Sequence, residues 1–252
     1  MKNGSKASSP NPDWTRDELI LALDLYFRLN SEQTSPANPQ IIELSQTLNS
    51  LPIHPRASQY QKFRNANAVS MKLSNFLRFD PTYKGKGLPR GNKLEEAVWN
   101  EFSSDLTRLH QIAVAIVQSS SLVSPPKDKL EIIEDKQEEF AEGRILTQLH
   151  KRRERNPALV DKKKKLVFQK TGALICEVCG FDFYQTYGLL GRGFVECHHN
   201  KPISTLSQEH TSKISDLSVV CANCHRMLHR IRPWKSPNEL KALMREMGTQ
   251  HV

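Results

Sequence analysis

Cysteine and long apolar runs are the two things this sequence has little of. No cysteine precedes residue 176, and all five lie in the last third of the 252 residues. No apolar run approaches the roughly eighteen residues needed to cross a bilayer. The N-terminal stretch MKNGSKASSPNPDW has no apolar segment behind its lysines, so a secretory signal is not supported. We expect no membrane partner and a cytoplasmic location.

Acidic residues are also in the minority. The chain has 27 acidic against 36 basic residues, which gives a net charge of +9 and an isoelectric point near 9.3. This balance favours a polyanionic partner, but it does not by itself separate nucleic acid from an acidic protein or a membrane surface. The hydrophobic content of 38% is typical of a soluble protein, and the length suits two small domains.

The first half of the chain has the apolar spacing of helices. Thr15 and Glu18 have the spacing of a capping box at the start of the first helix. Apolar residues recur at three- and four-residue steps from Leu94 to Ala113, which predicts one long amphipathic helix. We expect a disordered N-terminus at 1–13, a helical domain at 14–118, a Ser/Pro-rich linker at 119–143 and a second domain at 144–252.

Two features of the helical domain are candidate DNA contacts. The loop DPTYKGKGLPRGNK holds Lys84, Lys86 and Arg90 among flexible glycines, where they could follow a phosphate backbone. The polar positions Ser70, Lys72 and Asn75 of the preceding helix could instead enter a groove as a recognition helix. A solvated loop and a solvated helix face are the plain alternatives.

A strongly basic connector precedes the cysteines. Its candidate phosphate contacts are Arg152, Arg153, Arg155, Lys162 and Lys163. A solvated helix face explains such a run equally simply. Its position beside the cysteine segment favours a surface that binds phosphates.

The cysteines form two Cys-x-x-Cys pairs, CEVCG at 176–180 and CANCH at 221–225. Each short turn directs two sulfurs to one point, so the two turns together predict a tetrahedral zinc site. The ligands are Cys176, Cys179, Cys221 and Cys224. A redox pair would need a thioredoxin-like context, which is absent here. Cys197 has no partner in this pattern, and we expect a buried strand cysteine.

Four histidines accompany the cysteines. His198 and His199 are neighbours in VECHHNKPIS, and His225 and His229 are one helical turn apart in HRMLH. Neighbours on a strand point to opposite faces, so the simplest division within the first pair is one metal ligand and one base. His225 and His229 can face a single point from one helix.

The segments ECHHNKPIS, SDLSVVC and CANCHRMLH together resemble the HNH nuclease superfamily, in the zinc-stapled form of McrA-like restriction endonucleases. The resemblance covers roughly residues 144–229. It implies an α+β protein, in which a helical N-terminal domain precedes a small zinc-stapled ββα-metal (HNH) nuclease domain. It also implies hydrolysis of DNA phosphodiester bonds.

The resemblance implies a role for each histidine. His198 and His225 would bind a catalytic Mg²⁺, Mn²⁺ or other transition-metal ion, His229 would be an additional ligand, and His199 would be the general base. The Asn of the motif name corresponds to Asp216, which can accept a hydrogen bond but cannot donate one as an amide does. Asn223, between the zinc cysteines, is the competing candidate for that position.

The resulting prediction is a restriction-type DNA endonuclease with structural zinc, acting on double-stranded DNA as a homodimer at least on DNA. Modified DNA as the substrate follows only from the McrA-like resemblance. Two alternatives remain. One is a non-catalytic zinc-stabilised DNA-binding or regulatory protein, favoured by Asp216 in place of Asn. The other is a non-specific nuclease effector or toxin.

Overall fold

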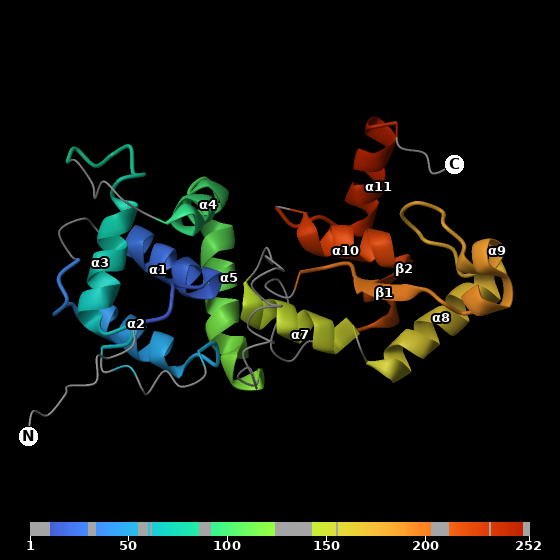
Figure 1. The fold of residues 1–252 in the computed structure, drawn as a ribbon, viewed down its shortest axis with the longest axis horizontal. Coiled ribbons are helices and arrows are strands. Elements are labelled where there is room, and N and C mark those ends of the chain that lie inside the picture. Colours follow the sequence, from blue (N-terminus) through green and yellow to red (C-terminus); the bar gives the residue numbers. More distant parts are fainter. Residues whose placement is uncertain are drawn as a thin grey trace, which may run out of the picture. The chain divides into compact units, whose positions relative to one another are not determined.

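The computed structural model describes residues 11–29, 34–54, 60, 62–85, 92–123, 143–154, 156–202, 212–231 and 233–248. These residues form two compact units. The first holds α1 to α5 together with residues 143–145, and the second holds the remaining described residues from Leu146 onward (Figure 1). The predicted disordered N-terminus and linker lie mostly outside the described residues, so their boundaries stay predictions.

The first unit is built around helix α1 (Arg16–Arg28), which contacts α2 (Pro39–Ser50), α3 (Ala66–Phe76), α4 (Lys93–Phe102) and α5 (Leu106–Ser119). A short 3-10 helix, η3 (Ser120–Leu122), follows α5. The predicted capping box is present, because the Glu18 carboxylate accepts from the Thr15 N–H at 2.7 Å. Leu19, Ile20 and Leu23 are fully buried, so α1 forms the core of this unit.

A buried ion pair lies within this core. Arg64 donates to the two carboxylate oxygens of Glu18 at 2.6 and 2.9 Å, and its guanidinium lies over the Trp14 ring. Burial raises the pKa of Glu18, but the hydrogen bonds and charges of His54 and Arg64 outweigh burial and lower that pKa. The paired charges tie α1 to the turn before α3.

The predicted long helix from Leu94 is wrong, because the chain forms two helices there. Helix α4 ends at Phe102, and α5 begins after Asp105, whose carboxylate accepts from the Arg108 N–H at 3.0 Å. An aspartate at this position satisfies an N–H that the first turn of a helix leaves open. The apolar periodicity continues across the break, which is why it suggested a single helix.

The polar face of α3 is not a recognition surface. Lys72 pairs with the buried Glu95, Asn75 donates to the same carboxylate at 3.1 Å, and the Ser70 hydroxyl donates to the Thr34 carbonyl. Burial opposes ionisation of Glu95, but Lys72 and Asn75 lower its pKa. Lys72 and Asn75 hold α3 against α4 and Ser70 holds it to the segment before α2, so the suggested recognition helix is wrong.

The second unit holds the small sheet. Strand β1 (Glu196–His199) pairs antiparallel with β2 (Leu217–Val220), and His198 is opposite Ser218. Helix α10 (Ala222–Arg230) packs on β1. Helix α7 (Arg144–Glu154) belongs to this unit from Leu146 onward. The other elements are α8 (Pro157–Thr171), α9 (Phe183–Tyr187), η4 (Gly188–Gly191), η6 (Ile214–Asp216) and α11 (Pro237–Glu246).

The sheet is covered on two sides by separate apolar clusters. Val219 packs with Val195, Cys197 and Leu217, against which Leu159 of α8 lies. Val220 belongs to a second cluster, which includes the paired cysteines and apolar residues of α10 and α11. Neighbouring strand residues point to opposite faces, so two four-residue strands suffice to join these clusters. The α+β fold class is confirmed.

Candidate metal centres and HNH site

The four paired cysteines converge on one point. Their sulfurs form a group of candidate metal ligands, and Cys179 Sγ lies 3.7 Å from Cys221 Sγ. Zinc bound to sulfur at about 2.3 Å sets tetrahedral sulfurs about 3.8 Å apart. The sulfur spacing therefore suits a zinc ion.

The local backbone explains how each pair is positioned. The first pair lies in a tight turn closed by the Gly180 N–H on the Cys176 carbonyl at 2.9 Å, and Gly180 has a φ of +80°. The turn is joined to β2, since Glu177 N–H donates to the Val219 carbonyl at 2.9 Å. Cys221 caps the start of α10. A turn and a helix start therefore face each other across the cluster.

The fifth cysteine belongs elsewhere. Cys197 points into the apolar cluster beneath α8, and burial raises the pKa of its thiol to about 11. Among the paired cysteines, a hydrogen bond from Cys224 lowers the pKa of Cys176, whereas the pKa values of Cys179 and Cys224 are raised. Its place in a separate apolar cluster, away from the four converging sulfurs, is what separates Cys197 from the zinc ligands.

A second group of candidate ligands lies at the other end of α10. Three imidazoles surround the buried carboxylate of Glu154, the last described residue of α7. His198 Nδ1 lies 2.8 Å, His225 Nε2 3.1 Å and His229 Nε2 3.2 Å from its oxygens. The two α10 imidazoles are 3.1 Å apart at Nε2. Strand β1 and helices α7 and α10 thus each contribute to one cluster.

This donor set fits a divalent ion. Ligand atoms about 2.1 Å from an ion occupy tetrahedral corners about 3.4 Å apart, close to the spacings of this cluster. Imidazole nitrogens with one carboxylate suit Mn²⁺, Zn²⁺ and related ions. On its other ring nitrogen, His225 contacts the Glu196 carboxylate. A carboxylate in that position orients the imidazole for coordination.

The charge around His225 is strongly negative. Burial lowers its pKa, but the hydrogen bonds and charges of Glu154 and Glu196 overcome this and raise the pKa to about 9. The hydrogen bond to His225 in turn lowers the pKa of the Glu196 carboxyl, which stabilises its ionised form. A cation is therefore favoured at this point, and an ion that binds His225 displaces a proton.

The His199 side chain lies on the other face of β1 from His198, because neighbouring residues of a strand point to opposite faces. Its Nε2 lies 3.0 Å from the Ser212 hydroxyl oxygen, on the segment before η6. Its backbone N–H donates to Glu154 Oε1 at 3.3 Å. The side chain is 3% exposed. The side chains of the two neighbouring histidines therefore have different partners, as the alternation predicts.

Asp216 holds the two loops that flank the sheet. Its carboxylate accepts from the Lys213 N–H at 2.8 Å, and its carbonyl accepts from the Asn200 N–H at 2.7 Å. Asn200 directly follows the histidine pair, so this bond fixes the end of β1. Asn223, the competing residue, lies exposed in the first turn of α10. The backbone carbonyl of Asp216 thus contacts the residue after β1, and its carboxylate holds the turn before β2.

Comparison with known proteins decides the family of this unit. Residues 176–230 match the family model described as HNH endonuclease. The chain carries an HNH endonuclease domain. This confirms the resemblance, and the four-cysteine cluster fits the zinc-stapled form. The domain is that of a metal-dependent nuclease, with DNA as the implied substrate. No curated protein and no solved structure gives a match.

Part of the predicted DNA surface lies outside the side chains that the structure describes. The side chains of Arg152 and Arg153, and Arg155 as a whole, belong to that part. Lys162 is exposed on α8, whereas Lys163 is half-buried with its ammonium 3.9 Å from Glu177. Helix α8 thus has an exposed lysine and, on its inner side, partly buried apolar residues that pack on the cluster around Val219.

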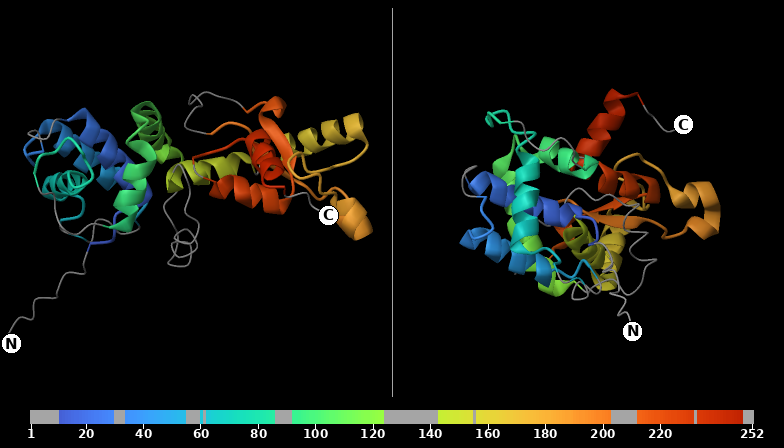
Figure 2. Two further views of the ribbon diagram at one scale, coloured as in Figure 1. Left: turned by 90° about the horizontal axis from the view of Figure 1, so that it is seen from above. Right: turned by 60° about the vertical axis from the view of Figure 1, so that its left-hand side comes forward.

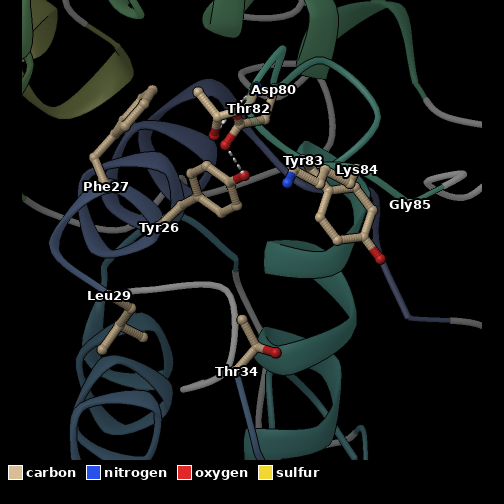
Figure 3. Close-up of a pocket in the computed structure, with 9 residues that line it drawn as sticks. All are labelled: Tyr26, Phe27, Leu29, Thr34, Asp80, Thr82, Tyr83, Lys84 and Gly85. Carbon is tan, nitrogen blue, oxygen red and sulfur yellow. Dashed lines mark hydrogen bonds between the residues drawn. The ribbon is translucent and has the colours of Figure 1, made fainter.

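The predicted basic loop of the first unit is described only at its start. Lys84 lines a pocket of about 550 Å³, whereas Lys86 and Arg90 lie outside the described residues. In the wall of this pocket, the Tyr26 hydroxyl donates to the Asp80 carboxylate at 2.6 Å (Figure 3). No residue of this pocket belongs to either ligand cluster.

No helix in the described part of the chain is long and apolar enough to span a bilayer.

Sequence reasoning missed three residues of the site. Glu154 is an acid within a run of arginines and lysines, and that isolation was its only signal. Glu196 lies two residues before His198, so strand alternation places both on one face. Ser212 carries no local signal, because its contact with His199 depends on the path of the chain between the two strands.

Proposed function

We propose that the protein is a restriction-type DNA endonuclease in which the HNH domain hydrolyses phosphodiester bonds with His199 as general base. The convergence of Glu154 with His198, His225 and His229, directly beside His199, is the observation that carries this proposal. A metal-binding cluster beside a histidine has the parts needed for phosphodiester hydrolysis.

The proposed ion site consists of His198, His225, His229 and Glu154. A divalent ion held there supplies charge stabilisation at the scissile phosphate and its leaving oxygen. Glu154 supplies the anionic ligand, and Glu196 orients His225 through its second ring nitrogen. The four cysteines serve a different ion, a structural zinc that holds the turn at Cys176 against the start of α10.

His199 acts through the two nitrogens of one ring. With Nε2–H donated to the Ser212 hydroxyl oxygen, Nδ1 becomes the nitrogen that takes the proton of the attacking water. Asp216 contributes by position, since it secures the backbone that follows the histidine pair. An Asp serves here in place of the Asn of the motif name, because the contacts concerned need only an acceptor.

The DNA path follows the basic face of α8. Lys162 is exposed there, and the arginines at 152, 153 and 155 immediately precede this helix. Several lysines and arginines that contact phosphates hold a duplex in place without reading its base sequence. Lys84, Lys86 and Arg90 of the first unit are proposed as secondary phosphate contacts.

Double-strand cleavage requires two such sites acting together, so we propose a homodimer, at least on DNA. Recognition of modified bases is the natural property of a McrA-like enzyme and is proposed on that resemblance alone. The helical unit is the candidate reader, although its α3 face is already occupied by internal contacts.

The test is cleavage of matched plasmids, one unmodified and one cytosine-methylated, with Mg²⁺ or Mn²⁺. The wild-type chain should cut, His199→Ala should not, and products should carry 5′-phosphate and 3′-hydroxyl ends. His110→Ala is the matched control, because this histidine lies on α5 of the other unit with a half-exposed side chain.

Each alternative has its own outcome in this assay. DNA binding without cutting under any metal would establish the non-catalytic reading. Cutting of both plasmids to small fragments, without preference, would establish the non-specific effector. Preferential cutting of the methylated plasmid by the wild-type chain, with no cutting of either plasmid by His199→Ala, would establish the modification-dependent restriction enzyme.

A further inference from the structure

The HNH domain carries an exposed apolar tip, defined here as Tyr187, Leu189, Leu190 and Phe194. Leu190 is 92% and Leu189 is 77% exposed, more than any other large apolar side chain in the described part of the chain. Single exposed apolar residues are ordinary, but a contiguous group marks a binding surface. The tip takes no part in either ligand cluster.

The tip stands on a rigid base. Phe183 of α9 packs edge-to-face on Phe194, with ring centroids 4.7 Å apart, and stacks with Tyr187 at 6.0 Å. A Cβ on the buried Gly191 would lie 1.9 Å from the Phe183 carbonyl oxygen, so the backbone of the tip lies directly on α9. Figure 2 shows α9 at the edge of the second unit. The leucines are therefore held outward by a packed support.

The surroundings of the tip are positively charged. Arg192 is exposed within the same turn, and Lys164 of α8 donates to the Gly193 carbonyl at 3.2 Å. The nearby acid Asp182 is engaged in capping α9 through the N–H groups of Tyr184 and Gln185. Positive charge around an apolar tip complements a partner that is anionic outside and apolar inside. It disfavours a second copy of the same basic surface.

We propose that Leu190, backed by Leu189, inserts between neighbouring base pairs of duplex DNA while Arg192 and the lysines of α8 contact the flanking phosphates. This rests on the proposed function, because both need DNA as the partner. Apolar side chains that enter a base stack kink the duplex, and the unstacking cost is offset by further protein contacts.

The position of the tip in the chain links this wedge to cleavage. Phe194 and Val195 lead directly into β1, so nine steps along the backbone join Leu190 to His199. A chain of that length spans at most roughly 30 Å, or about nine base-pair steps. A kink made by the tip therefore falls within about one helical turn of the scissile phosphate.

The test uses full-length chains carrying His199→Ala, so that DNA is bound but not cut. Duplexes containing 2-aminopurine at successive adenine positions report unstacking as a rise in fluorescence. The chain with an intact tip should give a rise at one or two neighbouring positions. Leu189→Ser with Leu190→Ser should abolish the rise and weaken binding about tenfold, by loss of buried apolar surface.

Three comparisons distinguish insertion of the tip between base pairs from other contributions to DNA binding. Met71→Ser removes an apolar side chain of the first unit that is 66% exposed and should change neither signal. Leu190→Phe keeps a wedge and should retain the rise. The double serine variant should leave the slope of log affinity against log salt unchanged, whereas Arg192→Ala should reduce it by about 0.9.

A duplex bound equally well, with the same fluorescence rise, by the double serine variant would overturn the wedge and leave the nuclease proposal standing. Loss of self-association in the double variant, measured by sedimentation without DNA, would overturn it in favour of a second copy as the occupant. Binding of the tip to anionic vesicles, with no effect on DNA, would overturn it in favour of a lipid surface. A chain that binds no duplex at all would remove both proposals.

Discussion

Glu154 Oε1 lies 2.8 Å from His198 Nδ1, so the end of a basic helix supplies the carboxylate at the centre of a histidine cluster. Glu154 lies outside residues 176–230, the segment that matches the HNH family. The lead-in helix α7 therefore supplies a residue of the proposed ion site.

Removal of this carboxylate should weaken ion binding. Glu154→Ala is expected to raise the dissociation constant for Mn²⁺ about tenfold or more, because one charged ligand is lost. Isothermal titration with Mn²⁺, and the visible spectrum of bound Co²⁺, measure the effect without relying on cleavage. Glu246→Ala on the exposed end of α11 is the matched control. Unchanged Mn²⁺ affinity in Glu154→Ala would show that this residue only pairs with the histidines.

The cysteines offer an internal comparison for the zinc site. Cys221→Ala should abolish zinc content and unfold the second unit, since a small unit of this kind depends on its metal. Cys197→Ala should retain one zinc per chain and cost about 1 kcal/mol, since it removes one buried sulfur. Atomic absorption and thermal unfolding provide both measurements. Equal loss of zinc in the two variants would contradict the assignment.

Ser212 should act as a positioning residue for His199. Ser212→Ala is expected to lower kcat about tenfold and leave KM for DNA unchanged, because the imidazole loses the group that orients it. Its pH–rate profile should shift relative to the wild type, an effect that a purely structural role would not produce. Ser215→Ala, on the neighbouring exposed turn, serves as the control. A change confined to KM would place Ser212 in DNA binding instead.

The phosphate contacts predicted on α8 have a salt signature. Lys162→Ala should reduce the slope of log affinity against log salt by about 0.9, because one fewer counterion is released on binding. Lys62→Ala, at an exposed position before α3 in the first unit, is the control of equal charge. Affinity measured across a series of salt concentrations gives both slopes. An identical slope in Lys162→Ala and the wild type would leave this lysine on a solvated face.

The stability of the first unit should depend on Glu18. The pKa of this carboxyl is lowered by its partners, so its contribution is complete above the unfolded pKa and is lost as the pH falls through the lower folded value. Glu18→Gln should therefore cost about 3 kcal/mol at neutral pH, and the loss should shrink in acid. Urea unfolding of Trp234→Phe chains, followed by the fluorescence of Trp14 and Trp99, tests this. A loss that is constant from pH 7 to pH 3 would contradict the ion pair.

The sequence by itself determined the chemistry that short spacings encode. Two Cys-x-x-Cys turns, adjacent histidines on a strand and histidines one helical turn apart place their side chains by local geometry alone, and the HNH domain followed from them. The same holds for the capping box of α1, whose two partners are three residues apart.

Only the tertiary structure decided where distant segments meet. Glu154 joined the histidines because α7 packs beside the sheet, and Lys72 turned inward because Glu95 of another helix lies opposite. Apolar periodicity could not reveal the break at Asp105, since the buried face continues across it. The exposure of Leu190 depends on Phe183 and Gly191, which hold the tip outward. Contacts between residues far apart in sequence arise from packing, and packing has no signature within a short stretch of sequence.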